Sequence, residues 1–268
     1  MSPRATTDTT SFDVREYAAT ARGSHRAAID GEAIARAGLS ADAVHLIRVL
    51  RDLERGTLDR MRNLLVTATH KDARVTAFLA TWAFEKYWVA DALDAVLEAV
   101  GAGTAPLTGP LRHSPAERAE RRGPIRRAIA GNIAGADIVA GHVATGLVDE
   151  LIAQAAYRRL GALATVLSSL VATLVAVKDR HVHFLAEEAE HKLAASARAV
   201  RLAKKAIAQA AWPIGATQIP AEDRSFFETL VFGDAEGRSA ATAIGDRLAA
   251  LPGLGSAQGA SVVARLVP

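Results

Sequence analysis

Four stretches of this chain carry apolar residues at alternating spacings of three and four, and this pattern constrains the fold more than any other feature. Side chains at these spacings lie on one face of an α-helix, where they form a continuous seam. The stretches cover residues 40–69, 73–100, 133–160 and 163–210. The sequence therefore predicts four long helices that pack against one another along these seams. The first two seams are Ala43, Ile47, Leu50, Glu54, Leu58, Met61 and Leu65, and Val75, Leu79, Trp82, Lys86, Val89, Leu93, Val96 and Val100. The other two are Val139, Val143, Gly146, Glu150, Ala153, Tyr157 and Leu160, and Leu167, Val171, Leu174, Lys178, His181, Leu185 and Glu188.

Composition agrees with a helical protein. Half of the 268 residues are hydrophobic but only 5% are aromatic, so helices packed through Ala and Leu are favoured over a sheet. The absence of Cys excludes disulfides, thiolate metal sites and Cys nucleophiles. The first 16 residues are polar and lack the apolar stretch of a signal peptide, so we expect a cytoplasmic protein.

The connections between the stretches predict how the chain is organised. The break at residues 70–72 is short, so the second helix should return antiparallel to the first. A longer connection at 101–125, with Gly, Pro and basic residues, allows the chain to cross over. We expect three regions: an N-terminal extension (1–39), weakly ordered to about residue 28 and then with a short helix through GEAIARAGL (31–39), a four-helix bundle (40–211), and a C-terminal extension packed on it (212–268). The last should hold helices near 221–232 and 236–250 and a Pro/Gly tail after Leu251.

Two segments raise the question of other partners. The basic run at 112–127, RHSPAERAERRGPIRR, could contact phosphates, but it lacks aromatic residues for base stacking. We therefore expect a solvated loop and no nucleic-acid partner. The uncharged run from Leu160 to Val177 is just long enough to span a bilayer. It is rich in small residues and continues directly into a charged helix, so we expect it to be buried by protein, with no membrane span.

Each of the four seams has ionisable residues near its middle. Buried charges need partners, because desolvation costs several kcal/mol per ion. A single charge on a seam can reach the surface along its aliphatic stem, but a charge on every seam predicts that they meet. We expect both lysine ammonium groups to point inward and form ion pairs with the two glutamates. The residues are Glu54, Lys86, Glu150, and Lys178 with His181.

Several segments together resemble a known family. They are Leu53-Glu54-Arg55, FLATWAFEKYWVADAL (78–93), GLVDELIAQAAYRRL (146–160), AVKDRHVHFLAEEAEHKL (176–193), WPIG (212–215) and LPGL (251–254). In order and spacing they are similar to bacterial ferritin-like domain proteins, which are distantly related to the acyl-carrier-protein desaturases. The resemblance implies an all-α fold, an antiparallel four-helix bundle with one long crossover. Such bundles hold two metals through a Glu on two helices and Glu-x-x-His on the other two.

Transferring these ligands residue by residue gives an incomplete site. Glu54 and Glu150 match the two single glutamates. The Glu-x-x-His positions hold Lys86 and Val89 on one helix, and Lys178 and His181 on the other. A protonated Lys cannot bind a metal and repels a cation. We therefore expect a degenerate, diiron-like site without metal or other cofactor, and a non-redox structural or binding role rather than an enzyme.

Two alternatives stay open. A second register uses Glu188-x-x-His191 as the Glu-x-x-His motif. Its iron or manganese ligands would be Glu54, Glu85, Glu150, Glu188 and His191, and the protein would be an oxidoreductase. Against it, Glu85 lies one residue off the seam, about 100° around the helix, and the residues around His191 are typical of a solvated face. The other alternative is a cofactor-independent enzyme that uses a buried Lys as base or Schiff-base nucleophile. The sequence names no small-molecule ligand, and the resemblance leaves a homodimer open.

Overall fold

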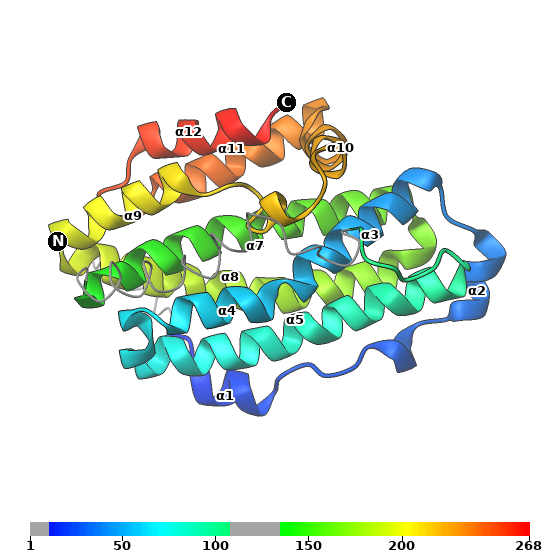
Figure 1. Cartoon of the computed structure of the whole chain (residues 1–268), viewed down its shortest axis with the longest axis horizontal. Helices are drawn as coiled ribbons and strands as arrows, with labels where there is room; N and C mark the ends of the chain where they lie inside the picture. Colours follow the sequence, from blue (N-terminus) through cyan, green and yellow to red (C-terminus); the bar gives the residue numbers. More distant parts are fainter. Residues whose placement is uncertain (1–10, 108–134) are drawn as a thin grey trace, which may run out of the picture.

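The computed structural model describes residues 11–107 and 135–268, and these residues form helices and connecting turns without a strand. The all-α class predicted from the seams is thus confirmed for this part of the chain. Helices α3 (Ala41–Arg55) and α4 (Thr57–Leu65) follow each other end to end along the long axis of the molecule (Figure 1). Helices α5 (Ala73–Ala99), α7 (Ile138–Leu163) and α8 (Ser168–Ala195) run beside them. The basic run at 112–127 lies outside the described residues.

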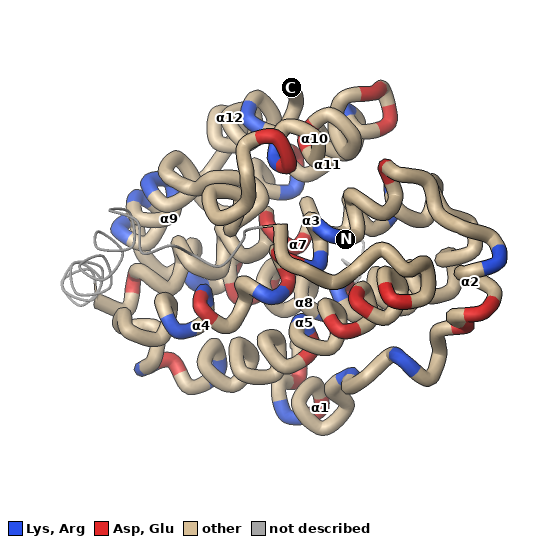
Figure 2. Tube along the Cα trace, turned by 45° about the vertical axis from the view of Figure 1, so that its right-hand side comes forward, with Lys and Arg blue, Asp and Glu red and all other residues tan. Residues whose placement is uncertain are grey.

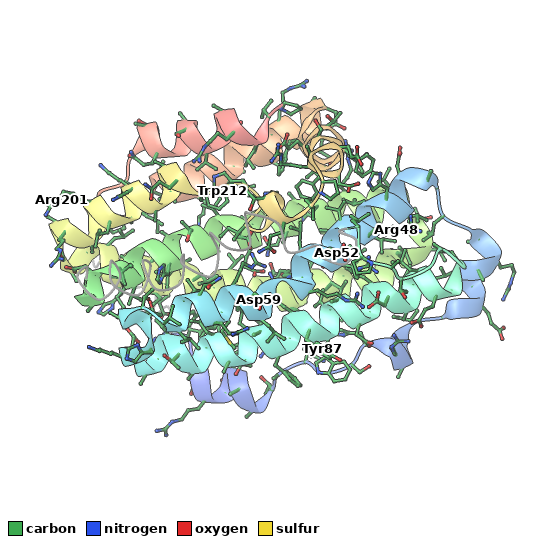
Figure 3. The ribbon with its side chains drawn as sticks, viewed as in Figure 1. Arg48, Asp52, Asp59, Tyr87, Arg201 and Trp212 are labelled. Carbon is green, nitrogen blue, oxygen red and sulfur yellow. The ribbon has the colours of Figure 1, made fainter. Side chains whose placement is uncertain are left out.

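Helix α5 covers the predicted stretch 73–100 to within one residue. The Asp72 side chain accepts a hydrogen bond from the amide of Val75 and so caps the first turn. The helix buries Lys86 on its inner face, whereas Tyr87, the next residue, is 54% exposed and points to solvent (Figure 3). Ser40 caps α3 in the same way, because its side chain accepts a hydrogen bond from the amide of Ala43.

The single helix predicted over residues 40–69 is wrong, because the chain breaks at Gly56 between α3 and α4. The break changes the phase of the buried face. Thr57 is buried and Leu58 is 48% exposed, although the seam predicted Leu58 to be buried. A short 3₁₀ turn, Ala68–Lys71, then connects α4 to α5.

The single helix predicted over residues 163–210 is also interrupted. Ser196 has an extended backbone, and its side chain accepts from the amides of Arg198 and Ala199 to start α9 (Ala197–Gln209). Helix α9 then packs against α7. The uncharged run is divided as well, because Ala164 separates α7 from α8. Within the described ranges, no helix combines the length and hydropathy needed to cross a membrane.

The N-terminal region is more ordered than the sequence indicated. Residues up to about 28 were expected to be weakly structured, but the described part contains α1 (Val14–Ala19) with Phe12 and Tyr17 buried beside it. The short helix expected near residue 31 is present as α2 (Gly31–Ala37). In Figure 1 the segment runs along the outer side of α5.

The C-terminal helices pack against α7 and α9. Two of them, α10 (Ala221–Phe232) and α11 (Ala235–Ala249), agree with the prediction. The prediction of a Pro/Gly tail after Leu251 is wrong, because helix α12 (Ser256–Leu266) follows. Helices α11 and α12 approach so closely that a Cβ atom at Gly259 would lie 2.4 Å from the carbonyl oxygen of Gly245.

Candidate functional site

The charged seam residues come from four helices and meet in the interior. Figure 2 shows acidic and basic residues among α5, α7 and α8 in the middle of the molecule as well as on the surface. None of the five predicted side chains is more than 3% exposed. They are Glu54 on α3, Lys86 on α5, Glu150 on α7, and Lys178 and His181 on α8.

Two lysines and two glutamates form a ring of alternating charge, which we call the ion-pair ring. Lys86 Nζ lies 3.1 Å from Glu54 Oε2 and 2.9 Å from Glu150 Oε1. Lys178 Nζ lies 2.7 Å from Glu54 Oε1 and 3.3 Å from Glu150 Oε2. Each ammonium group therefore contacts both carboxylates, and these ion pairs are the ones that the seam positions predicted. The four formal charges sum to zero.

Two further side chains hold the carboxylates in place, and sequence reasoning missed both. Trp82 Nε1 donates a 2.7 Å hydrogen bond to Glu150 Oε1. The Tyr157 hydroxyl donates a 3.0 Å hydrogen bond to Glu54 Oε1. Both lie on the seams, one turn before Lys86 and two turns after Glu150 respectively. A polar aromatic side chain on a charged seam is a usable signal, because its donor needs a buried acceptor.

Glu85 belongs to the same cluster, contrary to the expectation that its position off the seam would keep it away. It is fully buried, and its Oε2 lies 2.9 Å from His181 Nε2. The other ring nitrogen, Nδ1, lies 3.3 Å from Glu150 Oε2. Carboxylate oxygens only accept hydrogen bonds, so His181 satisfies both contacts only when both of its nitrogens carry a proton.

The N-terminal segment is the reason for the burial of Glu85. The Tyr17 hydroxyl donates to Glu85 Oε2 at 2.8 Å, and the backbone amide of Arg22 donates to Oε1 at 2.7 Å. The guanidinium of Arg180 lies 3.5 Å from the same Oε1. Local periodicity could not reveal these contacts, because the partners of Glu85 come from a segment more than 60 residues away.

The Glu188-x-x-His191 pair of the second register lies elsewhere. Glu188 is 4% exposed, so the prediction of a solvated face is wrong for this residue. It forms ion pairs with Arg74 Nε at 3.0 Å and Lys192 Nζ at 3.2 Å, whereas His191 is exposed. In the described part of the chain, no group of three or more His, Asp or Glu side chains is arranged to hold a metal ion.

The ring fixes the protonation of its members. Burial would raise the pKa values of Glu54 and Glu150, but Lys178 and Lys86 outweigh burial and hold both carboxyl pKa values below their ordinary range. Burial would lower the pKa of Lys86, but Glu150 and Glu54 raise it above its ordinary value. Burial and the neighbouring Glu54 raise the pKa of the Tyr157 hydroxyl well above its ordinary value. Glu54, Glu150 and Lys86 are therefore charged at neutral pH.

A cavity of about 20 Å³ reaches the ring from the side of the loop after α9, with room for about one water molecule. Arg60 covers it by donating to Asp149 Oδ2 at 2.6 Å and to the carbonyl oxygen of Ile214 at 3.2 Å. The amide of Ile214 donates to Asp149 Oδ1 at 2.8 Å, so the Trp212–Gly215 turn is fastened over the opening. A water molecule therefore fits this cavity, and a bulky substrate does not.

Comparison with family models, curated proteins and solved structures finds no match to this chain. The chemistry of the site is therefore argued from its geometry. Two ammonium groups neutralise two carboxylates, and an imidazole connects this ring to a third carboxylate, Glu85. Such a cluster can hold the helices that carry it in register.

Proposed function

We propose that this chain is a ferritin-like four-helix bundle with one long crossover, in which Lys–Glu ion pairs occupy the place of a dimetal centre, and that its role is structural or binding and not redox. The order of the seam residues and the resemblance of the segments around them support this proposal. Its place in the cell is proposed to be the cytoplasm.

The observation that carries the proposal is the sharing of both carboxylates by both ammonium groups. A dimetal site needs bridging carboxylates, which hold the two divalent cations a few ångströms apart. Here Lys86 and Lys178 stand at the positions that the resemblance assigns to such carboxylates, and they engage Glu54 and Glu150 within 3.3 Å. A lysine could become a ligand only by losing its proton, and the raised pKa of Lys86 opposes this.

The second candidate is an iron- or manganese-dependent oxidoreductase. Its support is the burial of Glu85 beside His181, which brings three carboxylates and one imidazole into one buried cluster, although among the described residues these side chains are not arranged to hold a metal ion. Carboxylate and imidazole are suitable ligands for both metals. An enzyme based on a reactive lysine is less well supported, since the partners of Lys86 keep it protonated.

Metal analysis and a constructive variant test the proposal. The native protein, purified from medium containing iron and manganese, should hold far less than one metal per chain by mass spectrometry. The triple variant Lys86→Glu, Val89→His, Lys178→Glu should bind Mn²⁺ or Fe²⁺ and gain thermal stability when the metal is added, because its carboxylates then need a counter-ion.

The matched control is Lys86→Met with Lys178→Met, which removes the repulsion without adding ligands and should bind metal more weakly than the triple variant. Stoichiometric iron or manganese in the native protein, lost in a Glu85→Gln variant, would reject the proposal in favour of the oxidoreductase.

A further inference from the structure

The segment of residues 11–22 lies on α5 and α8 in the manner of a bound peptide. Two of its side chains, Phe12 and Tyr17, are less than 9% exposed, and most of the others face solvent. Their rings pack against Phe78, at centroid distances of 6.4 and 5.4 Å, and Phe12 also contacts Phe184 at 5.3 Å. Two aromatic anchors five residues apart thus attach the segment.

Side chains of α5 and α8 hold the backbone of this segment at both ends. At the beginning, the amide of Phe12 donates to Glu187 Oε2 at 2.7 Å, and Arg74 Nη1 donates to the Phe12 carbonyl at 3.0 Å. Further along, Arg180 donates to the carbonyl oxygens of Tyr17 and Thr20, both at 3.0 Å. Peptide-binding grooves use this combination, in which main-chain hydrogen bonds give affinity and side-chain pockets give specificity.

The same segment closes the charge cluster. The Tyr17 ring lies edge-to-face with the His181 ring at 6.2 Å, and the Tyr17 hydroxyl and the Arg22 amide both donate to Glu85. A hollow of about 790 Å³ lies beside the segment, lined in part by Tyr17, Arg22 and Arg180. The segment therefore lies at the edge of an open hollow and not within a close-packed core.

We infer that α5 and α8 form a peptide-binding groove and that residues 11–22 are its intramolecular ligand, which seals Glu85 and His181 from solvent. Release of the segment opens the cluster on this side, which is separate from the cavity under Arg60. The groove accepts a peptide with two aromatic residues at this spacing, in the same chain or added in trans.

Cleavage of the connection tests the inference in the full-length protein. A protease recognition sequence is inserted after Gly23, where a side chain would have free space. After cleavage the N-terminal fragment should stay bound to the folded remainder during gel filtration. A fluorescein-labelled peptide of residues 11–22 should then displace it in a saturable manner, measured by fluorescence anisotropy.

Variant peptides define the contacts. Tyr17→Phe should weaken displacement about tenfold or more, because a hydrogen bond to a buried charged acceptor is lost. The control peptide, Glu16→Gln, changes an exposed side chain and should remain within about twofold. Three results would overturn the inference: unfolding after cleavage, loss of the fragment without rebinding of either peptide, or equal binding of the native and Tyr17→Phe peptides.

Discussion

Replacing Lys86 with methionine tests whether the ion-pair ring is dry. Methionine keeps the length of the aliphatic stem, so the change removes an ammonium group with little loss of packing. Glu54 then keeps only Lys178 as a cationic partner, and the ring changes from neutral to one net negative charge. The surrounding side chains leave this charge little access to water, because Glu54 and Glu150 are at most 3% exposed.

The expected loss in the free energy of unfolding is about 3–5 kcal/mol, which is typical of a buried ion pair that has lost one partner. This is a large part of the 5–15 kcal/mol by which a typical domain is stable. The double variant Lys86→Met with Glu54→Gln removes one charge of each sign and restores neutrality. It should lose less than the sum of the single variants, with a coupling energy of about 1–3 kcal/mol.

Urea unfolding followed by circular dichroism and tryptophan fluorescence measures these differences. The control is Lys205→Met on α9, an exposed lysine that should change stability by less than about 0.5 kcal/mol. A loss below about 1 kcal/mol for Lys86→Met, with unchanged urea dependence, would show that water reaches the ring. Additive losses in the double variant would show that Lys86 and Glu54 do not interact, and either result refutes the reasoning.

Three other predictions concern the same interior and the C-terminal helices. Glu54 and Glu150 have carboxyl pKa values below the ordinary value of 4.5, so their charged forms stabilise the fold fully above pH 4.5. This contribution is lost as the pH falls through the lowered pKa values. Lys86 has a pKa above the ordinary value of 10.5, so its charged form stabilises the fold fully below pH 10.5, and this contribution is lost at higher pH. Urea unfolding at a series of pH values should therefore give a free energy of unfolding with a plateau that declines at both ends. Tyr157→Phe removes a donor to a buried carboxylate and should cost about 1.5–3 kcal/mol by urea unfolding. Gly259→Ala should cost about 1–3 kcal/mol by calorimetry, because the new Cβ atom forces α11 and α12 apart; unchanged stability would contradict this.

The helix breaks could not be read from periodicity. Apolar spacing continues through Gly56 and Ser196, and a single Gly in a helix costs only about 1 kcal/mol, so nothing local requires an interruption. The turn at Ser196 instead places α9 against α7, which is a contact between distant parts of the chain that local spacing does not show. Helix α12 was missed for a different reason, since a Gly at the contact with α11 is not recognised as a core residue.

The charged residues of the site were predictable in part. Glu54, Lys86 and Lys178 stood out because each interrupts an apolar seam. Glu85 did not, because α5 buries a second face against the N-terminal segment, and a single seam describes only one face. A signal existed, since a long helix with apolar residues on nearly all sides is buried on more than one side. Tyr17 gave no signal, because the polar sequence around it is typical of a loop.

The ion-pair ring also has a consequence for temperature. The hydration of charged groups becomes less favourable on heating, so the penalty for keeping the four charged groups of the ring away from water decreases. Hydrophobic stabilisation per unit area levels off over the same range. Contacts of the aliphatic core therefore gain nothing further near the unfolding temperature, while Lys86, Lys178 and their two carboxylate partners hold α3, α5, α7 and α8 together more effectively than at 25 °C.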